Sequence, residues 1–177
     1  MAAILGGDQA AVEAKLAELG LEPANYNGGG QIVAAGSTEG IAALQAEPVA
    51  GTRVIPLQVA GAFHTRFMKP AVETLRDYSK SIAIADPQIA LWSNNGGRKI
   101  SSGTEFVELL VNQVSSPVRW DLCMESMIAT GVTALIELSP AGTLAGIAKR
   151  AMPGVETLAL KTPDQLDAAI ELAKNHA

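Results

Sequence analysis

The first part of the chain is built around residues 23–35, which read Pro23-Ala-Asn-Tyr-Asn-Gly-Gly-Gly-Gln-Ile-Val-Ala-Ala35. Residues 23–27 predict a short strand, and residues 31–35 predict a return strand rich in β-formers. The three consecutive glycines between them supply the turn, so the pattern predicts a hairpin.

One strand and one helix flank this hairpin on each side. Before it, residues 1–5 predict a strand, and residues 9–19 predict a helix with apolar residues at helical spacing. After it, residues 38–46 predict a second helix and residues 53–59 a closing strand. The order β-α-β-β-α-β is the split-βαβ, ferredoxin-like pattern. We therefore expect residues 1–58 to form a four-stranded antiparallel sheet with two helices on one face.

The remaining residues, 59–177, predict a different organisation. Strands are expected over 89–93, 132–138 and 155–160, and helices alternate with them. These helices are expected over about 67–81, 104–114, 117–130, from the loop at 139–142 to about 151, and 163–174. Alternating strands and helices indicate a parallel α/β sheet. Three strands are few for such a domain, so either the sheet is small or an N-terminal part is missing.

Composition excludes several classes of protein. The chain has 177 residues, of which 48% are hydrophobic and 18% charged, so it can bury a core and is not intrinsically disordered. No apolar stretch approaches the ~20 residues of a transmembrane helix, and no signal peptide is evident, so we expect a cytoplasmic protein. The net charge of −5 argues against nucleic acid as a partner, and a single cysteine excludes a disulfide framework.

The loop Gly61-Ala-Phe-His-Thr65 follows a predicted strand and precedes a predicted helix. A histidine there is well placed to face a cleft at the strand ends, and histidine is the commonest general base. The simpler interpretation is a loop histidine that hydrogen-bonds a backbone carbonyl. His176 lies next to the C-terminus, which leaves His64 as the candidate for acid–base chemistry.

A general base needs a nucleophile, and the sequence offers none. It contains no G-x-S-x-G signature, and Cys123 lies mid-helix between apolar residues, which is typical of packing. No second histidine or cysteine accompanies His64, so a metal site is disfavoured. The glycines at 28–30 do not open onto a helix, so a hairpin turn is favoured over a phosphate cradle.

Three amides complete the set of polar candidates. Asn25 and Asn27 lie beside the glycine turn, where asparagine is favoured for local reasons. Gln113 precedes Val-Ser-Ser-Pro at a predicted helix end, where unpaired backbone carbonyls are available.

Several segments resemble the motifs of one family, in the family's order. Asn25-Tyr-Asn-Gly-Gly-Gly-Gln31-Ile-Val-Ala-Ala-Gly36 resembles its N-x-N-x-x-x-Q-x-V-x-x-G element, and Gly61-Ala-Phe-His-Thr-x-Phe-Met-x-Pro70 resembles its active-site histidine segment. The later motifs are Ser93-Asn94, Pro117-Val-Arg-Trp120 and Glu137-Leu-Ser-Pro-Ala-Gly142-Thr-Leu. The family is malonyl-CoA:acyl carrier protein transacylase, the acyltransferase of fatty-acid and polyketide synthesis. The residues of these motifs are most similar to those of actinobacterial members.

The resemblance implies a fold and a reaction. Residues 1–58 would be the ferredoxin-like subdomain, and residues 59–177 the C-terminal portion of the α/β-hydrolase-like acyltransferase domain. In the family, a serine takes the malonyl group from malonyl-CoA and passes it to the phosphopantetheine thiol of acyl carrier protein, by ping-pong covalent catalysis. No metal or resident cofactor is implied, because the phosphopantetheine is carried by the protein partner.

The resemblance also implies roles for individual residues. His64 would be the general base and acid, oriented by the backbone carbonyl of Gln113 in place of a triad aspartate. Phe63 would exclude the α-methyl group of methylmalonyl by its bulk, and Asn25 and Asn27 would lie at the substrate site.

The same resemblance implies that the nucleophile-bearing N-terminal part is absent from this chain. The chain alone is therefore expected to be inactive. Two other interpretations stay open: a noncatalytic acyltransferase-like binding or scaffold module, and a small hydrolase with another nucleophile.

Overall fold

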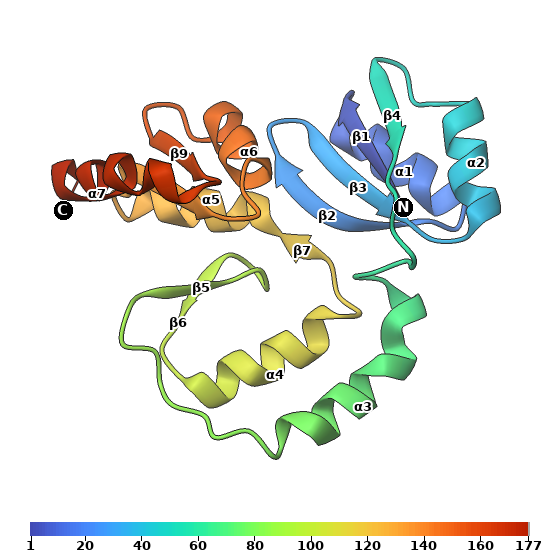
Figure 1. Cartoon of the computed structure of the whole chain (residues 1–177). Helices are drawn as coiled ribbons and strands as arrows, with labels where there is room; N and C mark the ends of the chain where they lie inside the picture. Colours follow the sequence, from blue (N-terminus) through green and yellow to red (C-terminus); the bar gives the residue numbers. More distant parts are fainter. Residues whose placement is uncertain (177) are drawn as a thin grey trace. The chain divides into compact units, whose positions relative to one another are not determined.

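The computed structural model describes residues 1–176 as a mixed α/β protein (Figure 1). The chain divides into two compact units between Cys123 and Met124, and each unit is described here by itself. No helix within the described residues has the length and apolar character that a membrane span requires.

A five-stranded sheet organises the first unit. Its strands lie in the order β4 (Thr52–Pro56), β1 (Ala2–Gly6), β3 (Gln31–Ala35), β2 (Glu22–Gly28) and β7 (Val118–Arg119). The first four pair antiparallel with one another, as the ferredoxin-like pattern predicts. The short strand β7 was not predicted; it adds to β2 in parallel through the pairs Asn25–Val118 and Tyr26–Arg119.

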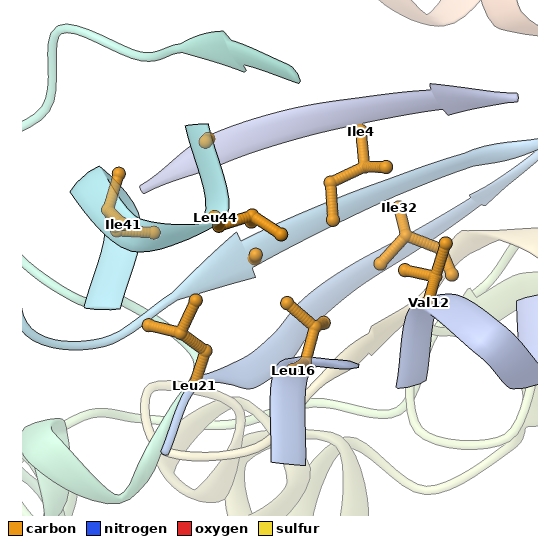
Figure 2. Packing of buried hydrophobic residues seen from close by; sticks show 9 residues of the cluster. Ile4, Val12, Leu16, Leu21, Ile32, Ile41 and Leu44 are labelled. Carbon is orange, nitrogen blue, oxygen red and sulfur yellow. The ribbon is translucent and has the colours of Figure 1, made fainter. Parts of the chain in front are cut away.

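Helices α1 (Gln9–Glu18) and α2 (Thr38–Ala46) cover the same face of this sheet, as predicted. Strand alternation directs Ile4 and Ile32 toward that face, where they meet Leu16 of α1 and Leu44 of α2 (Figure 2). Leu16 and Leu44 are completely buried, and each such side chain stabilises the fold by about 1.5–3 kcal/mol. The β-α-β-β-α-β order therefore places both helices on one face of the sheet.

The opposite face of the sheet carries a second apolar cluster. Ala3, Ala24, Val33 and Ala35 are buried there, and Ala62 packs against them. Because Ala62 lies two residues before His64, this cluster ties the histidine loop to the sheet face that the helices leave free.

The segment after β4 differs in part from the prediction. It contains a short 3₁₀ helix η1 (Arg66–Met68), helices α3 (Lys69–Ser79) and α4 (Gly103–Gln113), and strands β5 (Leu91–Ser93) and β6 (Arg98–Ile100). Strand β5 was expected in a parallel sheet, but it pairs antiparallel with β6. The sequence Asn94-Asn-Gly-Gly97 is therefore a hairpin turn, and its two glycines adopt positive φ angles of 76° and 64°.

The helix expected from Pro117 begins later, at Trp120. This helix, α5 (Trp120–Ala129), starts only after β7. Residues 118 and 119 are extended because Val118 pairs with β2 and the Arg119 N–H donates to the Asn94 carbonyl at 3.1 Å. These pairings override the helix-starting tendency of proline.

The second unit contains the parallel pair that the sequence predicts. Strands β8 (Ala134–Leu138) and β9 (Glu156–Leu160) are parallel and are joined by helix α6 (Thr143–Ala151). A 3₁₀ turn, η2 (Pro163–Gln165), and helix α7 (Leu166–Asn175) follow.

A buried carboxylate fixes the loop between β8 and α6. Glu137 is 9% exposed and accepts hydrogen bonds from the backbone N–H groups of Gly142, Leu144 and Ala145 at 2.7–3.0 Å. Burial alone would raise the pKa of this carboxyl, but the three donors and nearby Lys161 lower it below its ordinary value. The ionised side chain thus satisfies donors that a helix N-terminus leaves unpaired.

Candidate active site

The histidine loop connects β4 to η1 and holds His64 in an unusual backbone conformation. His64 has a φ of +64° and is the one described non-glycine residue with positive φ. Such a conformation costs about 1–3 kcal/mol and persists only where the surroundings impose it.

Thr65 supplies part of that restraint. Its side chain is completely buried, and its Oγ1 donates to the Ala62 carbonyl at 2.6 Å. The same oxygen accepts the Phe67 N–H at 3.3 Å and so caps η1. The residues on both sides of His64 are therefore fixed to each other.

The C-terminal end of α4 provides the second restraint. The Nδ1 of His64 lies 2.8 Å from the Gln113 carbonyl oxygen, and the His64 backbone N–H donates to the Val114 carbonyl at 3.0 Å. The expected hydrogen bond between the ring and Gln113 is therefore present. Arg76 of α3 bonds Glu108 at 2.5 Å and Asn112 at 3.0 Å, which ties α4 to the helix that follows the histidine loop.

This geometry sets the protonation pattern of a neutral His64 ring. A carbonyl oxygen only accepts hydrogen bonds, so Nδ1 carries the hydrogen and Nε2 keeps its lone pair. A half-buried ring with a free Nε2 lone pair can take a proton from a hydroxyl or a thiol. The imidazolium that results is stabilised by the partial negative charge of a helix C-terminus.

Phe63 precedes His64 and is 41% exposed. Its ring lies over Gly61, where an added Cβ would come within 3.4–3.9 Å of three ring carbons. The Phe63 ring therefore packs against the backbone at the start of the histidine loop.

Asn25 and Asn27 lie on β2, both half-buried. Asn25 is opposite Val33, which places it on the sheet face against which Ala62 packs. Asn27 falls at an irregularity in the β2–β3 register. Within residues 1–176, no hydrogen bond joins either amide to His64.

The remaining candidates behave as packing or structural groups. The Cys123 thiol is buried and donates to the Ser93 carbonyl at 3.3 Å. Burial, with a smaller contribution from Asp121, raises the pKa of this thiol to about 11, so it is a poor nucleophile. In the described part of the chain, no group of three or more potential side-chain ligands could hold a metal ion.

Sequence reasoning missed two restraints on His64. The buried hydroxyl of Thr65 and the Val114 carbonyl were not singled out. The threonine directly after the histidine, at the start of a helical segment, was the available signal, because threonine favours N-cap positions.

Comparison with known proteins defines the class. The family model described as "Acyl transferase domain" matches residues 1–166, so the chain belongs to the acyl transferase domain family. The matched region includes both His64 and Gln113.

Individual relatives narrow the similarity and confirm the resemblance to malonyl-CoA:acyl carrier protein transacylase. The chain is 47% identical over 167 residues to the malonyl CoA-acyl carrier protein transacylase of Mycobacterium tuberculosis, covering 94% of this chain and 55% of that protein. The crystal structure of MCAT from Mycobacterium tuberculosis superposes with a TM-score of 0.91 at 47% identity, over 97% of this chain and 56% of that one. The chain thus spans about half the length of these relatives.

A third similar structure contains a protein partner. It is described as a type II PKS acyl-carrier protein in complex with its malonyl-transacylase. It has a TM-score of 0.90 at 28% identity and covers 96% of this chain and 57% of that one.

Proposed function

We propose that this chain contributes the acid–base histidine of a malonyl-CoA:acyl carrier protein transacylase. The observation that carries the proposal is the 2.8 Å hydrogen bond between His64 Nδ1 and the Gln113 carbonyl, which leaves Nε2 free to accept a proton. The family match and the names of the relatives supply the reaction. Malonyl-CoA and acyl carrier protein are the substrates, and no resident cofactor takes part.

In the first half-reaction, a serine from the part of the enzyme outside this chain attacks the thioester carbonyl of malonyl-CoA. Its hydroxyl proton passes to His64 Nε2. The tetrahedral intermediate collapses, the carbon–sulfur bond breaks, and the CoA thiolate takes the proton from the imidazolium. The products are a malonyl-serine ester, free CoA and a neutral histidine.

In the second half-reaction, the phosphopantetheine thiol of acyl carrier protein gives its proton to Nε2. The sulfur attacks the malonyl ester, the bond to the serine oxygen breaks, and that oxygen regains the proton. His64 therefore acts as base and then as acid in both halves, and its Nδ1–H stays on the Gln113 carbonyl throughout.

Three further residues have proposed substrate roles. Phe63 limits the size of the acyl group by steric exclusion, which favours malonyl over branched analogues. Asn25 and Asn27 contribute amides near the substrate, supported for Asn25 by its place on the sheet face that Ala62 packs against.

The organisation of the whole enzyme is also part of the proposal. Residues 1–58 form the ferredoxin-like subdomain, and residues 59–177 belong to the C-terminal portion of the α/β-hydrolase-like domain. This division follows the pattern of elements rather than the two compact units. The serine-bearing portion would precede this chain, and a cytoplasmic location stays a prediction.

The test joins this chain to the serine-bearing portion of the Mycobacterium tuberculosis relative and measures malonyl transfer to acyl carrier protein. The substitution His64→Ala should lower the rate by about 10²–10⁴-fold. His176→Ala is the matched control, because it removes the other histidine and should leave the rate unchanged. Full activity of the His64→Ala fusion would refute the proposal. An inactive fusion that still binds acyl carrier protein would favour the noncatalytic binding module.

A further inference from the structure

The side chain of Gln113 makes contacts that its backbone role does not require. Its Nε2 donates one hydrogen bond to the Ser116 carbonyl at 2.8 Å and another to the Pro117 carbonyl at 3.1 Å. Both hydrogens of the amide nitrogen are therefore used, and both reach the turn that follows α4.

The two carbonyls that the amide reaches lie beyond the end of α4, so no N–H within that helix pairs with them, and Pro117 has no N–H to offer the turn. The Ser116 N–H already donates to the Gln113 carbonyl at 3.2 Å. With the amide contacts in the opposite direction, residues 113 and 116 are held to each other twice.

The same turn presents both acceptors that hold the histidine. The Gln113 carbonyl accepts the ring Nδ1–H of His64, and the Val114 carbonyl accepts the His64 backbone N–H. A shift of residues 113–117 would move both acceptors together. It would also release the residue whose φ of +64° needs outside restraint.

We propose that the Gln113 side chain is a positioning residue for His64. Its amide locks the turn after α4, the locked turn fixes the carbonyl under Nδ1, and that carbonyl keeps the hydrogen on Nδ1. Methionine, of similar length, offers no donor, and asparagine carries its amide on a side chain one methylene shorter. The inference rests on the proposed role of His64, but it concerns the ring before any substrate binds.

The experiment is a long-range ¹H–¹⁵N NMR measurement of the two histidine rings at about pH 8.5, where a histidine side chain is ordinarily neutral. The nitrogen shifts report the ratio of Nδ1–H to Nε2–H tautomers. Three variants of this chain are compared: Gln113→Met, Gln113→Asn and Gln45→Met. Gln45 is an exposed residue of α2, so it gives the matched control, and His176 reports in every spectrum whether its own surroundings are intact.

In the unsubstituted chain and in Gln45→Met, the Nδ1–H form of His64 should dominate. In Gln113→Met, the tautomer ratio should fall by about three- to tenfold, the range expected for loss of one ordered hydrogen bond, while the His176 signals stay in place. An unchanged ratio in folded Gln113→Met would overturn the inference. If Gln113→Met does not fold, Gln113→Asn decides: a lowered ratio supports the inference, and a ratio equal to that of the unsubstituted chain overturns it.

The outcome is independent of malonyl transfer. A fusion that transfers malonyl through His64, together with an unchanged tautomer ratio in the Gln113 variants, would remove the positioning role and leave the proposed function intact. A lowered tautomer ratio in the Gln113 variants, together with full malonyl transfer by a fusion that lacks His64, would support the positioning role and refute the proposed function.

Discussion

The backbone strain at His64 gives a prediction about stability that is separate from chemistry. Glycine adopts a φ of +64° without steric cost, whereas alanine does not. Comparing His64→Gly with His64→Ala removes the imidazole in both variants and changes only the backbone penalty. A left-handed conformation costs a non-glycine residue about 1–3 kcal/mol. Glycine avoids this cost but lowers the free energy of unfolding by about 0.4–1 kcal/mol, because its unfolded state has more conformational entropy. The glycine variant should therefore be more stable than the alanine variant by about 1 kcal/mol.

Urea unfolding followed by tryptophan fluorescence measures this difference. Trp92 and Trp120 both lie in the unit that contains His64, so their signal reports its unfolding. A difference of about 1 kcal/mol corresponds to a shift of about 0.5 M urea in the midpoint at an m-value near 2 kcal/mol/M.

The control is Ala42→Gly, at an exposed position inside α2. There the sign reverses, because glycine is about 1 kcal/mol less favourable than alanine in a helix. If His64→Gly is equal to or less stable than His64→Ala, while Ala42→Gly destabilises as expected, the restraint described for the histidine loop is wrong.

Three further predictions concern single side chains. In the complete enzyme, Phe63→Ser should raise kcat/KM for methylmalonyl-CoA relative to malonyl-CoA by about 10–200-fold, and an unchanged ratio would refute the steric account. Because burial raises the pKa of Cys123 to about 11, a thiol reagent should not label it at pH 8 unless denaturant is added; rapid labelling of the folded chain would contradict this. Glu137→Gln should lower the thermal midpoint at neutral pH. The folded-state pKa of Glu137 is depressed, so the stabilisation by its carboxylate is present above the ordinary pKa of 4.5 and is lost as the pH falls. The thermal midpoints of Glu137→Gln and of the unsubstituted chain should therefore converge in acid. A difference between the two midpoints that stays constant with pH would count against the ionised carboxylate.

Local pattern was enough to predict the ferredoxin-like part of the fold. The hairpin at 23–35 and the helical spacing of apolar residues on each side define which faces must be buried, and the observed sheet order follows from them. Strand β6 has three residues and strand β7 two, which is too short for a strand pattern to show in the sequence. Strand β7 also exists only through its pairing with the distant strand β2. In the same way, Pro117 carries a helix-start signal that the pairing of Val118 with β2 overrides.

The hydrogen bond between the His64 ring and the Gln113 carbonyl was predictable, but the other restraints on His64 were not. The loop position of His64 indicated a functional histidine, and the resemblance added its carbonyl partner, Gln113. The positive φ of His64 has no sequence signature, because most histidines have negative φ even though histidine is enriched among the uncommon exceptions. The bonds from Gln113 to the turn after α4 likewise depend on the path of the chain after the helix.

The most direct test of the proposal that this chain supplies the histidine and another portion of the enzyme supplies the serine is intact-protein mass spectrometry. The mass is measured after incubation with malonyl-CoA. This chain contains a histidine whose ring and backbone are held by hydrogen bonds, but no serine in a nucleophile signature. In the proposed function, the histidine and the serine act together as one catalytic unit. The account predicts no malonyl adduct on the 18.3 kDa chain, either alone or mixed with the serine-bearing portion of a relative, and an adduct on that portion in the mixture. A stoichiometric malonyl adduct on the 18.3 kDa chain alone would contradict the account and make the chain an independent catalyst.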